Sequence, residues 1–351
     1  KLIKTSQTRS QNPLINYTYI SSGAHGVTLH STDLEVGIKT NITASVNTDG
    51  EGLFPTSELN DIISVIDEGR VDIEIAGPHI NIKSEKGTSF DIPTLPFQEY
   101  PKVPENKHET IYNIDTSELK KILDAMTYAI NKDQLKPALG GALFSFSEEG
   151  LNFVSTDGHR LVVITKKNDS NIMEDFIIPK KYLNMLSAFI QGQKESSLIF
   201  SNDHVFINND GDILYSRLID EKYPNYNAVI PQENPYVLKL QKEDFLNSIK
   251  ATSIATNKNT NQISLNLALG EVFLKSINQS ESKTVHAPLK SAEYDGEKIS
   301  IGFNATYLKE AIMNYPTEDI LFLFKDELSA TLLLPETKNH KTTILLMPVR
   351  I

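Results

Sequence analysis

The chain has 351 residues, 39% of them hydrophobic, and a formal net charge of −11, which predicts three compact domains of roughly 100–130 residues each. It contains no cysteine, which excludes a disulfide framework and a thiolate-bound metal site. No apolar run approaches the ~20 residues that span a bilayer, so we expect a soluble, cytoplasmic protein with no membrane partner.

One short phrase occurs three times at nearly equal spacing. An aromatic or branched residue precedes Pro or Asn, and Leu follows four positions later, so that Leu59, Leu183 and Leu308 lie 124 and 125 residues apart. A period of about 20–50 residues would indicate a solenoid, whereas a period this long indicates a repeated domain. The sequence therefore predicts three copies of one domain, at residues 1–108, 109–234 and 235–351.

The expected elements follow the same repeat along the chain. Each phrase opens an amphipathic helix, and strands are expected after these helices at 71–75, 198–200 and 320–324. Copy two begins with a further helix at about 116–131, and copy three has a matching helix around Phe245 and Ile249. The equivalent helix of copy one would fall before Lys1, so we expect this chain to lack the N-terminal helix of copy one.

The segment at 155–162 raises the question of catalysis. Asp157 and His159 are two residues apart, so on a strand they would share one face as an acid–base pair or as metal ligands. The spacing suggests no third metal ligand, and no serine or cysteine lies in a recognisable nucleophile motif. Gly158 favours a bend rather than a straight strand. We favour a structural turn at Thr156-Asp157 with a half-buried histidine. A hydrolase that uses Asp157 and His159 remains an alternative.

Lysines recur on equivalent elements of copies two and three. The net negative charge disfavours simple adhesion to nucleic acid, because affinity for phosphate comes mainly from lysine and arginine contacts. A single basic face would still touch DNA weakly from one side. The recurring lysines are Lys120, Lys121, Lys132, Lys136, Lys180, Lys181, Lys242, Lys250 and Lys258.

Three segments together resemble the bacterial sliding clamps, the beta subunits of DNA polymerase III. They are residues 155–162, the ending at 345–351, and 301–304 followed by Tyr307-Leu308, and the resemblance covers essentially the whole chain in order. It implies an α+β fold of three clamp domains, each with two helices packed on curved antiparallel sheets. It further implies a ring, formed by a head-to-tail homodimer.

The resemblance implies a processivity factor of DNA replication, without catalytic activity or a cofactor. The ring would encircle double-stranded DNA without reading its sequence. It would bind the DNA polymerase III alpha subunit, the clamp loader, other DNA polymerases and mismatch-repair proteins through short peptides. A scaffold that binds partners but not DNA is a second alternative.

Carried over by position, the family's peptide-binding cleft lies between copies two and three. Ala228 stands where some relatives carry arginine, so its rim is expected to be less basic. The matching residues are Leu139, Thr156, Gly158, His159, Arg160, Leu161, Pro224, Val229, Leu328, Leu345, Leu346, Met347, Pro348, Val349 and Arg350.

The resemblance also implies a DNA surface, which the lysine pattern supports, and a ring interface. At the ring interface, Ala255 replaces a bulkier residue of relatives. The expected DNA contacts are Arg9, Lys120, Lys132, Lys136, Lys180, Lys181 and Lys250. The expected interface residues are Leu59, Ile63 and Ile66 on one side, and Ile254 and Ala255 on the other.

Overall fold

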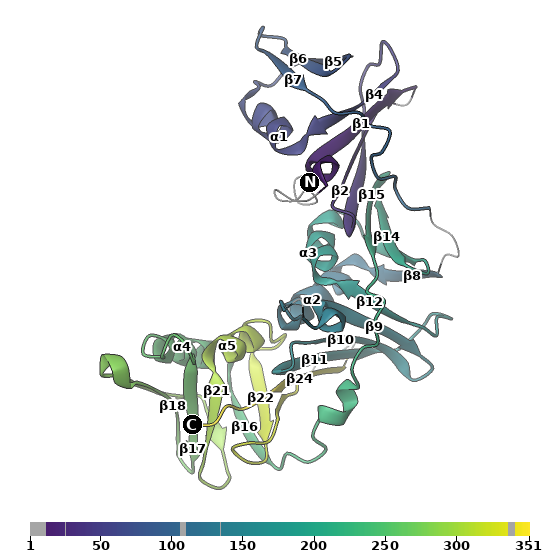
Figure 1. Ribbon diagram of the computed structural model, residues 1–351. Coiled ribbons are helices and arrows are strands. Elements are labelled where there is room, and N and C mark those ends of the chain that lie inside the picture. Colours follow the sequence, from purple (N-terminus) through teal and green to yellow (C-terminus); the bar gives the residue numbers. More distant parts are fainter. Residues whose placement is uncertain (1–11, 25, 106–109, 134, 336–340) are drawn as a thin grey trace. The chain divides into compact units, whose positions relative to one another are not determined.

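The computed structural model describes residues 12–24, 26–105, 110–133, 135–335 and 341–351 (Figure 1). The chain divides into two compact units. Unit 1 holds Lys1–Thr116 with Lys181–Leu218, and unit 2 holds Ser117–Lys180 with Ile219–Ile351. The second predicted copy is therefore divided between the two units.

An eight-stranded antiparallel sheet forms most of unit 1, in the order β4-β1-β2-β3-β15-β14-β13-β8. It joins two copies, because β3 pairs with β15, which places Gly37 opposite Tyr215. A side chain on Gly37 would come within 2.1 Å of the Tyr215 ring, so this close approach requires glycine. A second sheet has the order β5-β6-β7. The strands are β1 (Tyr17–Gly23), β2 (Gly26–Thr32), β3 (Val36–Ile42), β4 (Gly50–Pro55), β5 (Val71–Ala76), β6 (His79–Ser84), β7 (Ser89–Pro93), β8 (Thr110–Asp115), β13 (Glu195–Phe200), β14 (His204–Asn209) and β15 (Asp212–Arg217).

Two helices of unit 1 begin at the repeated phrase. α1 (Thr56–Val65) starts directly after Pro55, and α3 (Lys180–Phe189) starts directly after Pro179, with Lys180 itself assigned to unit 2. Proline has no N–H to lose at a helix start, which suits it to this place. Ile62 of α1 is buried in a cluster that also includes Phe54.

Unit 2 is built on a nine-stranded antiparallel sheet in the order β12-β9-β10-β11-β24-β23-β22-β16-β20. Here β11 of copy two lies beside β24 of copy three, far apart in sequence but adjacent in space (Figure 1). A four-stranded sheet has the order β19-β18-β17-β21. The strands are β9 (Gly141–Ser147), β10 (Gly150–Thr156), β11 (Arg160–Lys166), β12 (Asp175–Pro179), β16 (Tyr236–Gln241), β17 (Gln262–Ala268), β18 (Glu271–Asn278), β19 (Lys283–Pro288), β20 (Glu293–Tyr294), β21 (Ile299–Asn304), β22 (Asp319–Phe324), β23 (Thr331–Leu333) and β24 (Lys341–Leu346).

The helices of unit 2 are α2 (Thr116–Met126, whose first residue belongs to unit 1), α4 (Lys242–Ser253) and α5 (Ala305–Met313). Asn304 replaces proline in the third phrase because it caps α5: its Oδ1 accepts from the backbone N–H groups of Thr306 (2.9 Å) and Tyr307 (3.2 Å). Short 3-10 helices follow or connect these elements at η2 (Pro13–Asn16) in unit 1, and at η3 (Thr127–Ala129), η4 (Pro137–Gly140), η5 (Tyr226–Val229) and η6 (Gln279–Glu281) in unit 2.

The repeat and its elements are confirmed. The three strands predicted after the second helices are β5, β13 and β22. The helix predicted at about 116–131 is shorter: the α-helix ends at Met126, whose carbonyl accepts from Ser155 Oγ (2.7 Å) instead of continuing the helical pattern. None of the helices within the described ranges is long and apolar enough to cross a membrane.

Candidate functional site

The turn at residues 156–160, between β10 and β11, is closed by its own side chains. Thr156 Oγ1 donates to the Arg160 carbonyl (2.7 Å) and accepts from the Gly158 N–H (3.1 Å). Asp157 Oδ1 accepts from the N–H groups of His159 (3.0 Å) and Arg160 (3.1 Å). Gly158 has φ +88°, a conformation that favours glycine. The predicted Asx-type turn is confirmed, and Asp157 is bonded to the backbone rather than to the His159 ring.

Arg160 lies inside the protein with 5% of its side chain exposed. Its Nε donates to Asp157 Oδ2 (3.0 Å), Nη1 to Glu310 Oε2 (2.6 Å) and Nη2 to the Tyr128 carbonyl (2.8 Å). The guanidinium carbon lies 5.0 Å from the centroid of the Tyr128 ring and 4.5 Å from that of Tyr307. A buried cation needs such partners. Arg160 therefore joins copies two and three, and its guanidinium, although predicted to belong to the cleft, is bonded within the protein.

His159 is exposed, so the expectation of a half-buried histidine is wrong. The reason is that the turn projects its side chain outward, where the ring stacks on Tyr307 with 5.7 Å between centroids and 24° between planes. The His159 carbonyl accepts from the Met347 N–H (2.9 Å). A backbone hydrogen bond thus holds His159 of copy two beside Met347 of copy three.

A buried apolar cluster lies on the nine-stranded sheet and includes some of the predicted cleft residues. Leu139, Leu161 and Leu345 are the predicted cleft residues that belong to it, and Leu161 lies directly opposite Leu345 across the β11–β24 pair. The buried members are Leu139, Leu143, Val154, Leu161, Val163, Ile177, Tyr223, Leu332 and Leu345. Branched aliphatic side chains of this kind suit an apolar peptide anchor.

The remaining predicted residues differ in exposure. Pro224, Val229 and Leu328 are exposed, Met347 is 41% exposed, and Leu346 is buried. The first three and Met347 therefore have side-chain surface available to a partner, whereas Leu346 is enclosed by the protein.

Backbone bonds hold the C-terminal residues in place. The Val349 N–H donates to the Gly302 carbonyl (2.9 Å), and Gln262 Nε2 donates to the Arg350 carbonyl (2.8 Å). A β-carbon on Gly302 would lie 2.3 Å from the Val349 oxygen, so β21 can accept this segment only at a glycine. Pro348 and Val349 are half-buried, and Arg350 is exposed.

Several residues of this region were missed by the sequence predictions. A loop places Ile219, Tyr226 and Ile230 against the apolar cluster, and Tyr223 is buried within it. The available signal was a Tyr-Pro pair that recurs at Tyr100-Pro101 and Tyr223-Pro224. In copy one its tyrosine, Tyr100, is likewise buried, and its hydroxyl donates to backbone carbonyls.

The predicted DNA-contacting lysines fall into two groups. Lys132, Lys136 and Lys250 are exposed and Lys120 is half-buried, whereas Arg9 lies outside the described residues. The amines of the remaining two, Lys180 and Lys181, have partners within the protein.

Lys180 and Lys181 are engaged within the protein. Lys180 Nζ donates to the Ile130 carbonyl (2.9 Å), and burial, followed by the charge of Lys132, lowers the pKa of its amine. Lys181 Nζ pairs with Asp33, whose side chain is fully buried. Both amines are therefore less available to phosphate than the sequence suggested.

The predicted ring-interface residues are only partly free to meet another chain. Ile63 and Ile254 are exposed. Leu59 and Ile66 pack against the core cluster of copy one, and Ala255 is fully buried. Ala255 has no surface to offer a partner, because its own domain covers it.

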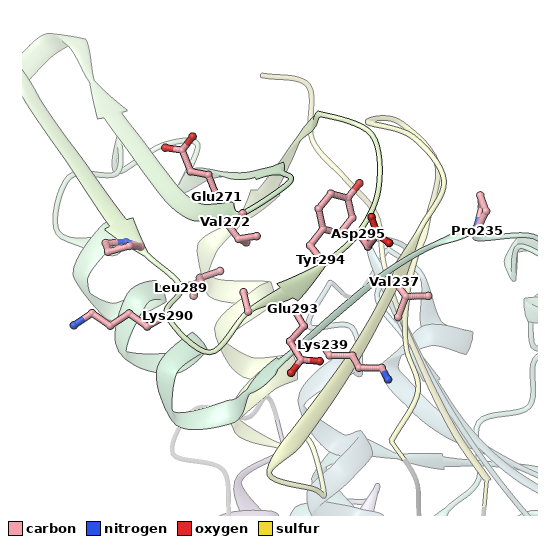
Figure 2. A pocket seen from close by; sticks show the side chains of 13 residues that line it. Pro235, Val237, Lys239, Glu271, Val272, Leu289, Lys290, Glu293, Tyr294 and Asp295 are labelled. Carbon is pink, nitrogen blue, oxygen red and sulfur yellow. The ribbon is translucent and has the colours of Figure 1, made fainter.

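A cavity of about 770 Å³ lies elsewhere in copy three (Figure 2). Val237, Val272 and Leu289 line it together with charged residues, and Figure 2 shows Glu271 and Lys290 pointing in different directions. No group of three or more potential metal ligands occurs within the residues that the structure describes. The cavity contains none of the predicted site residues.

Family models match nearly the whole chain. They are described as the DNA polymerase III beta subunit N-terminal domain (residues 1–104), central domain (113–225) and C-terminal domain (227–350). The chain is 25% identical over 348 residues to the beta sliding clamp of Pseudomonas putida, covering 98% of this chain and 94% of that protein. It is 27% identical over 349 residues to the beta sliding clamp of Rickettsia bellii, covering 92% and 88%.

Solved structures are similar throughout. The DNA polymerase III subunit beta from Pseudomonas aeruginosa superimposes with a TM-score of 0.91 at 23% identity, covering 100% of this chain and 96% of that one. A sliding clamp from Bartonella birtlesii bound to griselimycin gives a TM-score of 0.92 at 24% identity, covering 99% and 95%. At these identities the likeness establishes the fold.

Proposed function

The chain belongs to the DNA polymerase III beta subunit family, the sliding clamps of DNA replication. From this premise we propose that it keeps a DNA polymerase on its template by encircling the DNA. A closed ring slides on duplex DNA while the cleft between copies two and three holds a polymerase through a short peptide. The continuation of the sheets from one copy into the next, at β3–β15 and β11–β24, is the observation that supports this most directly.

The same repeat supports a head-to-tail dimer. By order within the copies, β3, β11 and β19 are equivalent, and so are β15, β24 and β7. β3 pairs with β15 and β11 pairs with β24, which leaves β19 and β7, each at the end of its sheet. Pairing β19 of one chain with β7 of a second chain would close a ring of six domains. In this proposal each chain contributes three domains to the ring, with boundaries after residues 108 and 234.

The function is tested by fluorescence anisotropy of a labelled Gln-Leu-Ser-Leu-Phe peptide titrated with the protein. We expect saturable binding near the micromolar range, about −8 kcal/mol. Absence of binding would remove the support for a peptide cleft. In the cell, the expected ligands are the DNA polymerase III alpha subunit, the clamp loader, other DNA polymerases and mismatch-repair proteins, in the cytoplasm.

Met347→Ala should weaken binding of this peptide by about 1–3 kcal/mol, because it removes an apolar wall of the cleft. The control is Met173→Ala, which truncates an exposed methionine outside the predicted cleft. Anisotropy titrations of both variants check the prediction. Equal affinity of Met347→Ala and the unaltered protein would show that the peptide binds elsewhere.

Lys132→Glu combined with Lys136→Glu should reduce retention on nicked circular DNA after loading. Because each phosphate contact contributes about 0.9 to the slope of log affinity against log salt, losing two should flatten the salt dependence by about two. Peptide affinity should change much less than DNA retention, although Lys136 Nζ lies near Gly158 of the predicted cleft. The same charge change at Lys86 and Lys102 is the control. Retention that falls equally in both pairs would mean that net charge, rather than this surface, holds DNA.

We propose no catalytic activity for the chain itself. The hydrolase alternative needs a free Asp157, but both of its carboxylate oxygens are engaged, one by backbone N–H groups and the other by Arg160. The alternative of a scaffold without DNA contact is separated from a clamp by the retention experiment. A scaffold would bind peptide normally and would not stay on circular DNA.

A further inference from the structure

The Thr-Asp turn occurs twice with the same hydrogen bonds. In copy one, Thr32 Oγ1 donates to the Val36 carbonyl (3.1 Å), and Asp33 Oδ1 accepts from the N–H groups of Glu35 (3.0 Å) and Val36 (2.8 Å). This reproduces the turn at residues 156–160, where the aspartate likewise accepts from the residues two and three positions on. In each copy the turn precedes the strand that joins the next copy.

Each turn is also fastened to the second helix of the next copy. In unit 1, the second oxygen of Asp33 pairs with Lys181 of α3. In unit 2, the second oxygen of Asp157 pairs with Arg160, which extends the link to Glu310 of α5. The two junctions use different residues, yet both place an ion pair between the turn and the following helix. Because the ion pair recurs at both junctions, we regard it as part of the junction and not as a chance surface contact.

Only the second link lies beside the predicted cleft. Tyr307 precedes Glu310 by three residues, so both side chains lie on one face of α5. Tyr307 stacks on His159, and Glu310 bonds to Arg160, so consecutive residues of the turn are held by one helix face. The His159 carbonyl in turn holds the N–H of Met347. A shift of α5 would therefore move His159 in copy two and, through the His159 carbonyl, Met347 in copy three.

We propose that Glu310 is a positioning residue for peptide binding: through Arg160 it fixes the turn that carries His159 and supports Met347. The inference rests on the proposed peptide-binding function and deepens it. The 2.6 Å contact between Glu310 and Arg160 is a charge-assisted bond, and the nearly complete burial of Arg160 makes an exchange of this partner for water unfavourable. Glu310 itself need not touch the peptide.

The test replaces one carboxylate by an amide at each junction. Glu310→Gln should raise the dissociation constant of the labelled Gln-Leu-Ser-Leu-Phe peptide roughly 2- to 30-fold, the range of coupling through a supporting network. It should also move the NMR signal of the His159 imidazole, which senses the ring current of Tyr307. The matched control is Asp33→Asn, which alters the equivalent link in unit 1 and should change neither readout. If Asp33→Asn does not fold, Asp67→Asn, which loses an exposed pair with Lys86, takes its place.

Three results would overturn the proposal. Unchanged peptide affinity in Glu310→Gln would show that the link does not support binding. A similar loss in Glu310→Gln and in the control would show that affinity follows general stability. A loss of affinity without movement of the His159 signal would place the effect outside the turn. Failure of the unaltered protein to bind the peptide would instead refute the proposed function itself, and the positioning role with it.

Discussion

Replacing Arg160 by methionine should destabilise unit 2 by about 3 kcal/mol. Methionine preserves much of the apolar stem but leaves Asp157, 11% exposed, without its cation, and it removes the link to Glu310. Loss of one partner from a buried pair costs about 3–5 kcal/mol, and the lower end applies because Glu310, 38% exposed, keeps contact with water. Urea unfolding followed by far-ultraviolet circular dichroism, with each transition fitted separately, measures the change.

The control for Arg160→Met is Lys167→Met, which removes an exposed ion pair with Asp169. Exposed pairs of this kind contribute little, so its unfolding midpoint should match that of the unaltered protein. A midpoint for Arg160→Met that also matches would mean that the ion pairs do not stabilise the junction. The Glu310→Gln experiment would then lose its physical basis as well.

The fold could be predicted because its signals are local and repeated. The helix starts at Pro55, Pro179 and Asn304 depend on backbone chemistry at one position, and each recurs at one period. The end of α2 could not be predicted, because it depends on Ser155, a residue that pairing of distant strands brings to Met126. The length of this helix therefore depends on a tertiary contact that no local pattern marks.

The apolar part of the site could be predicted better than its charged part. Leu161 and Leu345 lie opposite each other because β11 pairs with β24, and the resemblance already placed a cleft between copies two and three. Arg160 looked available because arginine is mostly exposed, and nothing in its neighbourhood pointed to Glu310, 150 residues away.

The partners of Lys180 and Lys181 could not be predicted for the same reason, since they are distant in sequence. Lys181 opens a helix as an exposed cation would, but its acceptor is Asp33, 148 residues earlier. Lys180 donates to a carbonyl at Ile130, which no sequence pattern marks as unsatisfied. Long-range polar partners carry no periodicity, so they appear only in the structure.

Gly302→Ala should lower peptide affinity at least tenfold, because the predicted cleft wall depends on where β21 receives the C-terminal segment. The added β-carbon would lie 2.3 Å from the Val349 oxygen, a backbone atom that cannot rotate away. The bond from the Val349 N–H to the Gly302 carbonyl, 2.9 Å, would be lost as the segment moves. Met347, two residues earlier, would move with it. Anisotropy with the labelled peptide measures the loss.

The control is Gly23→Ala, which adds the same carbon at the end of β1, where it would meet no atom within 4 Å beyond its two chain neighbours. It should bind peptide as the unaltered protein does. If Gly302→Ala also binds normally while its thermal midpoint falls, the C-terminal segment can detach from β21 without disturbing the cleft. In that case the β11–β24 pair alone would hold Met347 in place, and the contact between Gly302 and Val349 would serve stability rather than recognition.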